Sequence, residues 1–193
     1  MKRVILDAGH GIDTAGKRSP TWADGSQLLE WEFNRDIVSR IAHSLNSLGI
    51  NYNIITPERE DIPLPERVRR ANAIHAEDRS SYLLSIHANA GGGTGWEAFT
   101  SVGESLSDTY AEILYDKARA HLRDFPIRSC YTDGDSDKES GFYILRKSTC
   151  AAILTENLFM DTERDCRFIM SNTGRETIAQ IHTEAILSIN SLV

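Results

Sequence analysis

The feature that most constrains the fold is a pair of apolar runs that each end in a histidine among small residues. Residues 4–11 read Val-Ile-Leu-Asp-Ala-Gly-His-Gly, and residues 83–91 read Leu-Leu-Ser-Ile-His-Ala-Asn-Ala-Gly. Short apolar runs bounded by glycine are typical of buried strands, and ligands of open α/β sheets gather beyond the carboxyl ends of such strands. The pattern therefore predicts that His10 and His87 meet at one edge of a sheet, where two histidines indicate a metal site.

Strand and helix signals alternate along the rest of the chain. Strands are expected at 3–7, 52–56, 81–88, 96–100, 142–145 and 151–155, and helices at 28–48, 65–76, 105–122, 161–170 and 174–192. The stretches between Gly9 and Gln27 and between Arg123 and Gly141 are expected to be irregular. No internal repeat, linker or low-complexity tract interrupts the alternation, so residues 1–193 are expected to form one α/β domain.

Composition narrows the choice of partners. The chain has 21 Lys and Arg against 28 Asp and Glu, which gives a net charge of −7. Nucleic acid and anionic membranes call for a basic surface, so neither is expected as a main partner. Cys130, Cys150 and Cys166 lie in no metal-binding or disulfide spacing and are expected to be free, partly buried thiols.

The candidate third ligand is a carboxylate. Catalytic zinc sites use about three His, Asp or Glu ligands and leave one position open. Glu30 opens the helix that follows the His10 loop, and Glu32 is an alternative on another face of the same helix. An acidic residue in a first turn also interacts favourably with the helix dipole, so the pattern alone does not choose between a ligand and a helix-stabilising residue.

Glu156 is the candidate general base. It comes directly after the apolar run at 151–155, where a carboxyl group is expected at the rim of the sheet and partly desolvated. Desolvation raises a carboxyl pKa and a nearby metal ion lowers it. A metal hydrolase needs a base that deprotonates the bound water, and a carboxylate at this place could serve as one. The structural alternative is that Glu156 caps a turn before Asn157.

Four motifs follow one another over nearly the whole chain. They are Leu-Asp-Ala-Gly-His-Gly at 6–11, Leu-Glu-Trp-Glu-Phe-Asn at 29–34, Ser-Ile-His-Ala-Asn-Ala at 85–90 and Ile-Leu-Thr-Glu at 153–156. In this order they resemble the zinc-dependent N-acetylmuramoyl-L-alanine amidases of bacterial autolysins and phage endolysins. The corresponding family motifs read LDPGHG, E-x-x-x-N, SIHANA and L-V-E.

The resemblance assigns roles to individual residues. It implies that His10, Glu30 and His87 bind Zn²⁺ and that Glu156 is the catalytic glutamate. It favours Glu30 over Glu32, because Asn34 matches the asparagine that follows the family's ligand. Asn89 is expected either to position substrate or to serve only as a turn residue.

The resemblance also implies a fold and a reaction. The fold is a three-layer sandwich, with a twisted, mainly parallel (mixed) sheet of about six strands flanked by helices. The reaction is hydrolysis of the amide between N-acetylmuramic acid and the L-alanine of a stem peptide, with peptidoglycan or a muropeptide as substrate. The alternatives are a zinc peptidase acting on other peptides and a non-catalytic peptidoglycan-binding domain.

The sequence departs from the family pattern at three places. Alanine replaces a family proline at Ala8 and at Ala151, which affects backbone stiffness rather than ligand chemistry. Residues 157–159 read Asn-Leu-Phe where many members have Gly-Phe.

The acidic stretch 133–137 lacks the spacing of an EF-hand and is expected to be a solvated loop.

Location is a further expectation. The run at 4–6 is too short for the apolar region of a signal peptide, and no apolar segment approaches the length of a membrane span. No separate wall-binding domain is visible. The protein is therefore expected to be made in the cytoplasm and to act on the wall after release, or after removal of a leader.

Overall fold

The computed structural model describes residues 1–132 and 134–192. Over these ranges a mixed sheet of six strands runs in the order β2-β1-β3-β6-β4-β5. The strands are β1 (Val4–Ala8), β2 (Tyr52–Ile54), β3 (Tyr82–Asn89), β4 (Trp96–Thr100), β5 (Lys138–Glu139) and β6 (Ala151–Phe159). The four strands β2, β1, β3 and β6 are parallel, and β4 pairs antiparallel with β6.

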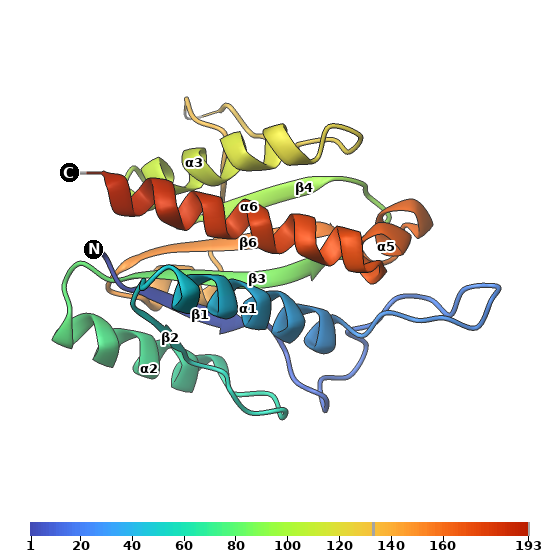
Figure 1. The fold of residues 1–193 in the computed structure, drawn as a ribbon, viewed down its shortest axis with the longest axis horizontal. Coiled ribbons are helices and arrows are strands. Elements are labelled where there is room, and N and C mark those ends of the chain that lie inside the picture. Colours follow the sequence, from blue (N-terminus) through green and yellow to red (C-terminus); the bar gives the residue numbers. More distant parts are fainter. Residues whose placement is uncertain (133, 193) are drawn as a thin grey trace.

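Helices cover both faces of this sheet. They are α1 (Glu30–Ser47), α2 (Leu64–Glu77), α3 (Leu106–His121), α4 (Tyr143–Lys147), α5 (Glu163–Met170) and α6 (Asn172–Ser191). Figure 1 shows α1, α3, α5 and α6 along one face, where the main apolar cluster lies. The opposite face packs a smaller apolar cluster with side chains of α2 and α4. The expected single-domain sandwich with a mixed sheet is confirmed.

Helix α1 illustrates how the apolar spacing produces this packing. Phe33, Ile37, Ile41 and Leu45 recur at intervals that place them on one helical face, and all four are buried. The helix ends before Gly49, whose φ of 67° lies in the left-handed region that glycine adopts without strain. The buried stripe holds α1 against the sheet, with its first residue at the carboxyl end of β1.

The segment 142–145, expected as a strand, is instead the N-terminal side of helix α4. Two of its apolar residues, Ile144 and Leu145, bury against the α2 side of the sheet. A short apolar run does not distinguish a strand from one turn of a buried helix. The neighbouring stretch expected to be irregular contains the two-residue strand β5, which extends the sheet beside β4.

Strand β6 is longer than expected and changes the setting of Glu156. It continues to Phe159 because β4 pairs with it antiparallel from Leu154 to Asn157 and Asn89 of β3 pairs with Phe159. Glu156 therefore lies within the strand, and the predicted turn before Asn157 is absent from this part of the described chain. Asp133, within the acidic stretch, lies outside the described residues.

Both ends of the described chain meet at the edge of the sheet where β1 begins. The ammonium group of Lys2 donates to the carbonyl oxygens of Ile189 (3.2 Å) and Leu192 (2.6 Å), and Figure 1 places both termini on this side.

The three cysteines are free, as expected, and Cys150 and Cys166 are buried. Among the described helices, none combines the length and apolar character needed to cross a membrane.

Candidate active site

Three of the predicted site residues come together at the carboxyl ends of β1 and β3. His10 follows β1, Glu30 is the first residue of α1, and His87 lies near the end of β3. His10 has a φ of 61°, which is uncommon for a residue with a side chain. This left-handed backbone forms the turn between β1 and the polar loop that leads to α1.

The three side chains are within ligand distance of one another. Glu30 Oε1 lies 3.4 Å from His10 Nε2 and 3.2 Å from His87 Nδ1. One ligand atom from each of the three residues lies within 4.8 Å of the others. Glu32, the alternative, is exposed and points to Arg175, with 3.6 Å between Oε1 and Nη1. The structure thus places Glu30, and not Glu32, with the histidines.

The donor set fits a zinc ion. Two imidazoles and one carboxylate are a ligand combination of catalytic zinc, which keeps a position open. Glu30 is only 1 % exposed, and its Oε2 has no hydrogen-bond partner among the described residues. An ionised oxygen buried in this way is costly unless a cation compensates it. Lys17 Nζ lies 4.0 Å from Oε2, and its side chain is 43 % exposed.

Burial by itself would lower the pKa of His87, but the hydrogen bond of Glu30 and the charges of Glu156 and Glu30 raise it. At His10 burial has the larger effect. It lowers the pKa of His10 to about 4, so His10 is neutral near pH 7 and has a free lone pair. Burial by itself would raise the pKa of Glu30, but the hydrogen bond and charge of His87 hold it below its ordinary value. A neutral imidazole and an ionised carboxylate are the forms that bind metals.

Glu156 lies beside this cluster, on the neighbouring strand. Its Cα is the register partner of His87 across β3 and β6. Burial raises the pKa of Glu156 to about 7, and its Oε2 has no hydrogen-bond partner among the described residues. A carboxyl group with such a pKa can both accept and release a proton near neutral pH.

Glu156 and both histidines line a pocket of ≈ 270 Å³. Its remaining walls are polar at the base and apolar toward α2 and α4: Asp7, Lys17, Leu64, Phe142, Tyr143, Ile144 and Leu154. Leu64 and Phe142 are both exposed. The pocket thus has buried carboxyl groups at its bottom and an exposed apolar wall on one side.

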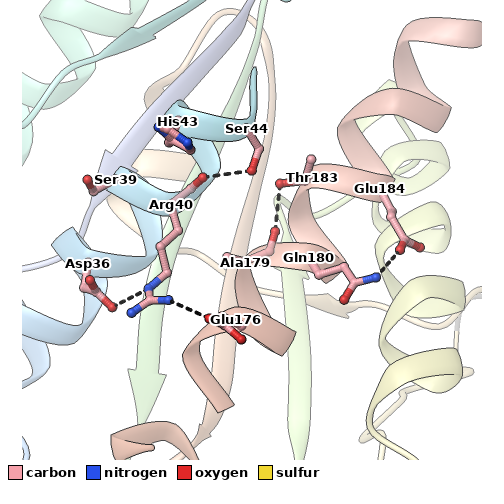
Figure 2. A pocket seen from close by; sticks show the side chains of 10 residues that line it. All are labelled: Asp36, Ser39, Arg40, His43, Ser44, Glu176, Ala179, Gln180, Thr183 and Glu184. Carbon is pink, nitrogen blue, oxygen red and sulfur yellow. Dashed lines mark hydrogen bonds and ion pairs between the residues drawn. The ribbon is translucent and has the colours of Figure 1, made fainter. Parts of the chain in front are cut away.

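A second groove of ≈ 570 Å³ lies between α1 and α6 and contains none of these residues. Figure 2 shows its charged side chains paired with one another. Arg40 contacts Asp36 and Glu176, and Gln180 donates to Glu184. The charged groups of this groove therefore have partners within it, in contrast to Glu30 and Glu156, whose Oε2 atoms have no hydrogen-bond partner among the described residues.

Two polar residues of the motifs to which the sequence analysis assigned no role lie directly behind the candidate metal cluster. Ser85 Oγ is 3.2 Å from His87 Nε2 and donates a 2.6 Å hydrogen bond to Asp7 Oδ2. Both residues are fully buried. The available signal was their polarity within otherwise apolar strands, together with the two-residue spacing that puts Ser85 and His87 on one face.

The side chain of Asn89 is held internally. Its amide nitrogen donates to Glu97 Oε1 at 2.7 Å, and its Oδ1 accepts from the backbone N–H of Ala90 at 2.8 Å. The divergent Asn157 also supports the site, because its amide donates to the carbonyl oxygen of His87 at 2.9 Å. The residue that differs from the usual family pattern therefore anchors the backbone of a predicted ligand.

Comparisons with known proteins show the family of the chain. The sequence profile described as N-acetylmuramoyl-L-alanine amidase matches residues 4–188. N-acetylmuramoyl-L-alanine amidase CwlM of Bacillus licheniformis is 29% identical over 189 residues, covering 96% of this chain and 68% of that protein. The endolysin of Bacillus phage SPP1 is 30% identical over 200 residues, covering 99% of this chain and 67% of the endolysin.

Solved structures share the fold. An N-acetylmuramoyl-L-alanine amidase from Clostridium difficile 630 superposes with a TM-score of 0.82 at 23% identity, covering 100% of this chain and 98% of the other. AmiC2 of Nostoc punctiforme gives 0.80 at 23% identity, covering 99% and 98%. The fold is that of amidase catalytic domains. With the profile match over most of its length, the chain belongs to the N-acetylmuramoyl-L-alanine amidase family and is a peptidoglycan amidase.

Proposed function

We propose that this amidase is zinc-dependent and cleaves the amide bond between N-acetylmuramic acid and the L-alanine of peptidoglycan stem peptides. The observation that carries the proposal is Glu30, a buried carboxylate whose Oε1 lies beside two histidines and whose Oε2 has no hydrogen bond among the described residues. Glu156, another buried carboxyl group, lies next to them on the adjoining strand.

His10, Glu30 and His87 would hold the zinc ion. When bound, zinc supplies Lewis-acid polarisation of the amide carbonyl and lowers the pKa of water toward about 7. The positive charge would also lower the pKa of Glu156 from the value of about 7 that burial gives it. Glu156 would then be ionised at neutral pH and ready to act as a base.

Glu156 would move the proton that the reaction requires. Its carboxylate accepts a proton from the attacking water as the oxygen bonds to the carbonyl carbon. The same carboxyl group then donates that proton to the alanine nitrogen as the C–N bond breaks. One residue thus serves as general base and general acid in turn.

The pocket walls would orient the substrate around this pair of steps. Leu64, Phe142 and Tyr143 present an apolar surface on one side of the pocket. Sugar rings pack well against such faces, so we place the muramoyl group there. Asn89, anchored by Glu97, would border the peptide side.

We further propose that the enzyme acts on the cell wall after release from the cytoplasm or after removal of a leader. Peptidoglycan is the substrate that the family membership implies, and it lies beyond the membrane. The net charge of −7 gives no support to binding of nucleic acid.

The test combines metal analysis with mass spectrometry of digested muropeptides. We expect one zinc per chain and release of free stem peptides that begin with L-alanine. Glu156→Gln is expected to keep zinc and lose turnover. Cleavage of sugar-free peptides alone would favour a zinc peptidase, and zinc binding without cleavage of either substrate would favour a binding domain.

A further inference from the structure

The two ring nitrogens of His87 face different groups. Nδ1 lies 3.2 Å from Glu30 Oε1, and Nε2 lies 3.2 Å from Ser85 Oγ. A histidine binds a metal through one nitrogen, and the partner of the other nitrogen decides which one remains protonated. The contacts of Ser85 therefore determine which ring nitrogen of His87 can bind a metal ion.

Ser85 has a single hydroxyl proton, which it donates in a hydrogen bond to Asp7. The hydroxyl lies 2.6 Å from Asp7 Oδ2 inside the sheet. Asp7 and Ser85 are register partners on β1 and β3, so their side chains lie on the same face as His87, two residues further along β3. With its proton committed to Asp7, the Ser85 oxygen can only accept from His87 Nε2.

Arg67 occupies the other oxygen of Asp7. Its guanidinium donates to Asp7 Oδ1 at 3.0 Å, with Arg67 3 % and Asp7 0 % exposed. Oδ1 of Asp7 thus accepts from Arg67 while Oδ2 accepts from Ser85, so both carboxyl oxygens serve as acceptors. Arg67 is held in turn by the carbonyl oxygens of Ala8 and Ile62 and by Asp61, so the pair is fixed from several sides.

We propose that Asp7 and Ser85 are positioning residues that keep the proton of His87 on Nε2, so that His87 offers Nδ1 to the metal. His10 offers Nε2, the atom nearer to Glu30. This inference rests on the proposed zinc dependence and adds to it the ligand atoms and a buried hydrogen-bond chain. The chain runs from Arg67 on α2 through β1 and β3 to the metal site.

The chain also explains why the ring holds one orientation. A ring flip would place carbon atoms where Ser85 and Glu30 now find nitrogens, with loss of both contacts. Partners behind a metal-ligating histidine typically change metal affinity or activity by about 10–100-fold. Removal of the Ser85 hydroxyl should therefore weaken zinc binding although Ser85 does not touch the metal.

The experiment compares Ser85→Ala, Ser85→Thr and Ser81→Ala in the full chain. Ser81 is a matched control, because it is also buried and its Oγ lies 3.0 Å from His75 Nδ1, away from the site. Zinc dissociation constants are measured by competition with a chelator. We expect Ser85→Ala to weaken zinc binding by about 10–100-fold, Ser85→Thr to restore most of the affinity, and Ser81→Ala to leave it within about twofold.

The ligand atoms are read directly by NMR of ¹⁵N-histidine protein loaded with ¹¹³Cd²⁺. We expect metal–nitrogen coupling at Nδ1 of His87 and Nε2 of His10, and a retained proton on Nε2 of His87. Coupling at Nε2 of His87, or unchanged zinc affinity in Ser85→Ala, overturns the inference. Either result with zinc-dependent cleavage intact leaves the proposed function standing, whereas wild-type protein without zinc binding refutes the proposed function itself.

Discussion

The side-chain amide of Asn34 donates a 3.0 Å hydrogen bond to the carbonyl oxygen of Gly9, the residue before His10. Asn34 lies one turn after Glu30 on α1 and is fully buried. One helix therefore supplies the carboxylate of the candidate metal site and also fixes the backbone that carries its first histidine.

Replacement of Asn34 by alanine should weaken both the fold and the metal site. The buried Gly9 carbonyl would lose its side-chain donor, which costs about 1–3 kcal/mol of unfolding free energy, and His10 would be held less firmly. Chemical denaturation and zinc titration measure the two effects. Asn46→Ala, at an exposed position of the same helix, should change neither; equal behaviour of the two variants would contradict this role for Asn34.

Gly9→Ala should damage metal binding more than folding. A Cβ at Gly9 would lie 2.1 Å from Cε1 of the His87 ring, so the ring must leave its position. The backbone of Gly9 is outside the left-handed region, and alanine adds no strain of that kind. We expect zinc affinity to fall at least roughly tenfold while the protein stays folded by circular dichroism. Gly141→Ala, with no neighbour within 4 Å, is the control.

Glu156→Gln should stabilise the metal-free protein at alkaline pH. The folded-state pKa of Glu156 is about 7, above the unfolded value of 4.5, so the fold favours the protonated form. Stability from this group is complete below pH 4.5 and is lost as the pH rises through 7, by up to about 3 kcal/mol. Urea denaturation from pH 5 to 8.5 should show the variant gaining over wild type with pH. A constant difference would contradict the shifted pKa.

His182 should contribute the opposite pH dependence. It is fully buried, its Nε2 lies 2.9 Å from Thr155 Oγ1, and burial lowers its pKa to about 4. Its neutral form is favoured in the fold, so stability is complete above the unfolded pKa of 6.5. About 3 kcal/mol is lost as the pH falls from 6.5 to 4.

The comparison that isolates His182 is the slope of unfolding free energy against pH in wild type and His182→Gln. Other groups, including His10, contribute equally to both proteins and cancel in the difference. We expect the variant to have the flatter profile between pH 6.5 and 4. Identical slopes would show that His182 does not titrate with a lowered pKa in the fold.

The strand-end histidines were predictable because their signal is local. An apolar run that stops at glycine and histidine fixes both the strand and the place where the side chain emerges. Glu30 required more, since the helical pattern left Glu32 open until the match at Asn34 favoured one register. The structure agrees because the buried stripe of α1 rotates Glu30 toward the histidines and Glu32 toward solvent.

The remaining features depend on contacts distant in sequence. Asp7 is separated from Arg67 by α1 and β2, and from Ser85 by α2 as well, so its polarity within an apolar strand does not identify these two partners. The extension of β6 past Glu156 depends on pairing with β4, which is set by tertiary packing. Residues 142–145 are an apolar run that fits a strand or a helix, and their burial beside α2 favours the helix.

The contact between Lys2 and the last turn of α6 has a consequence for how the enzyme meets its polymer. It gathers both ends of the described chain at the edge where β1 begins, whereas the pocket opens where β1 and β3 end. A module joined at either end would therefore lie on the side of the molecule away from the pocket. Such an attachment would leave the mouth of the pocket unobstructed.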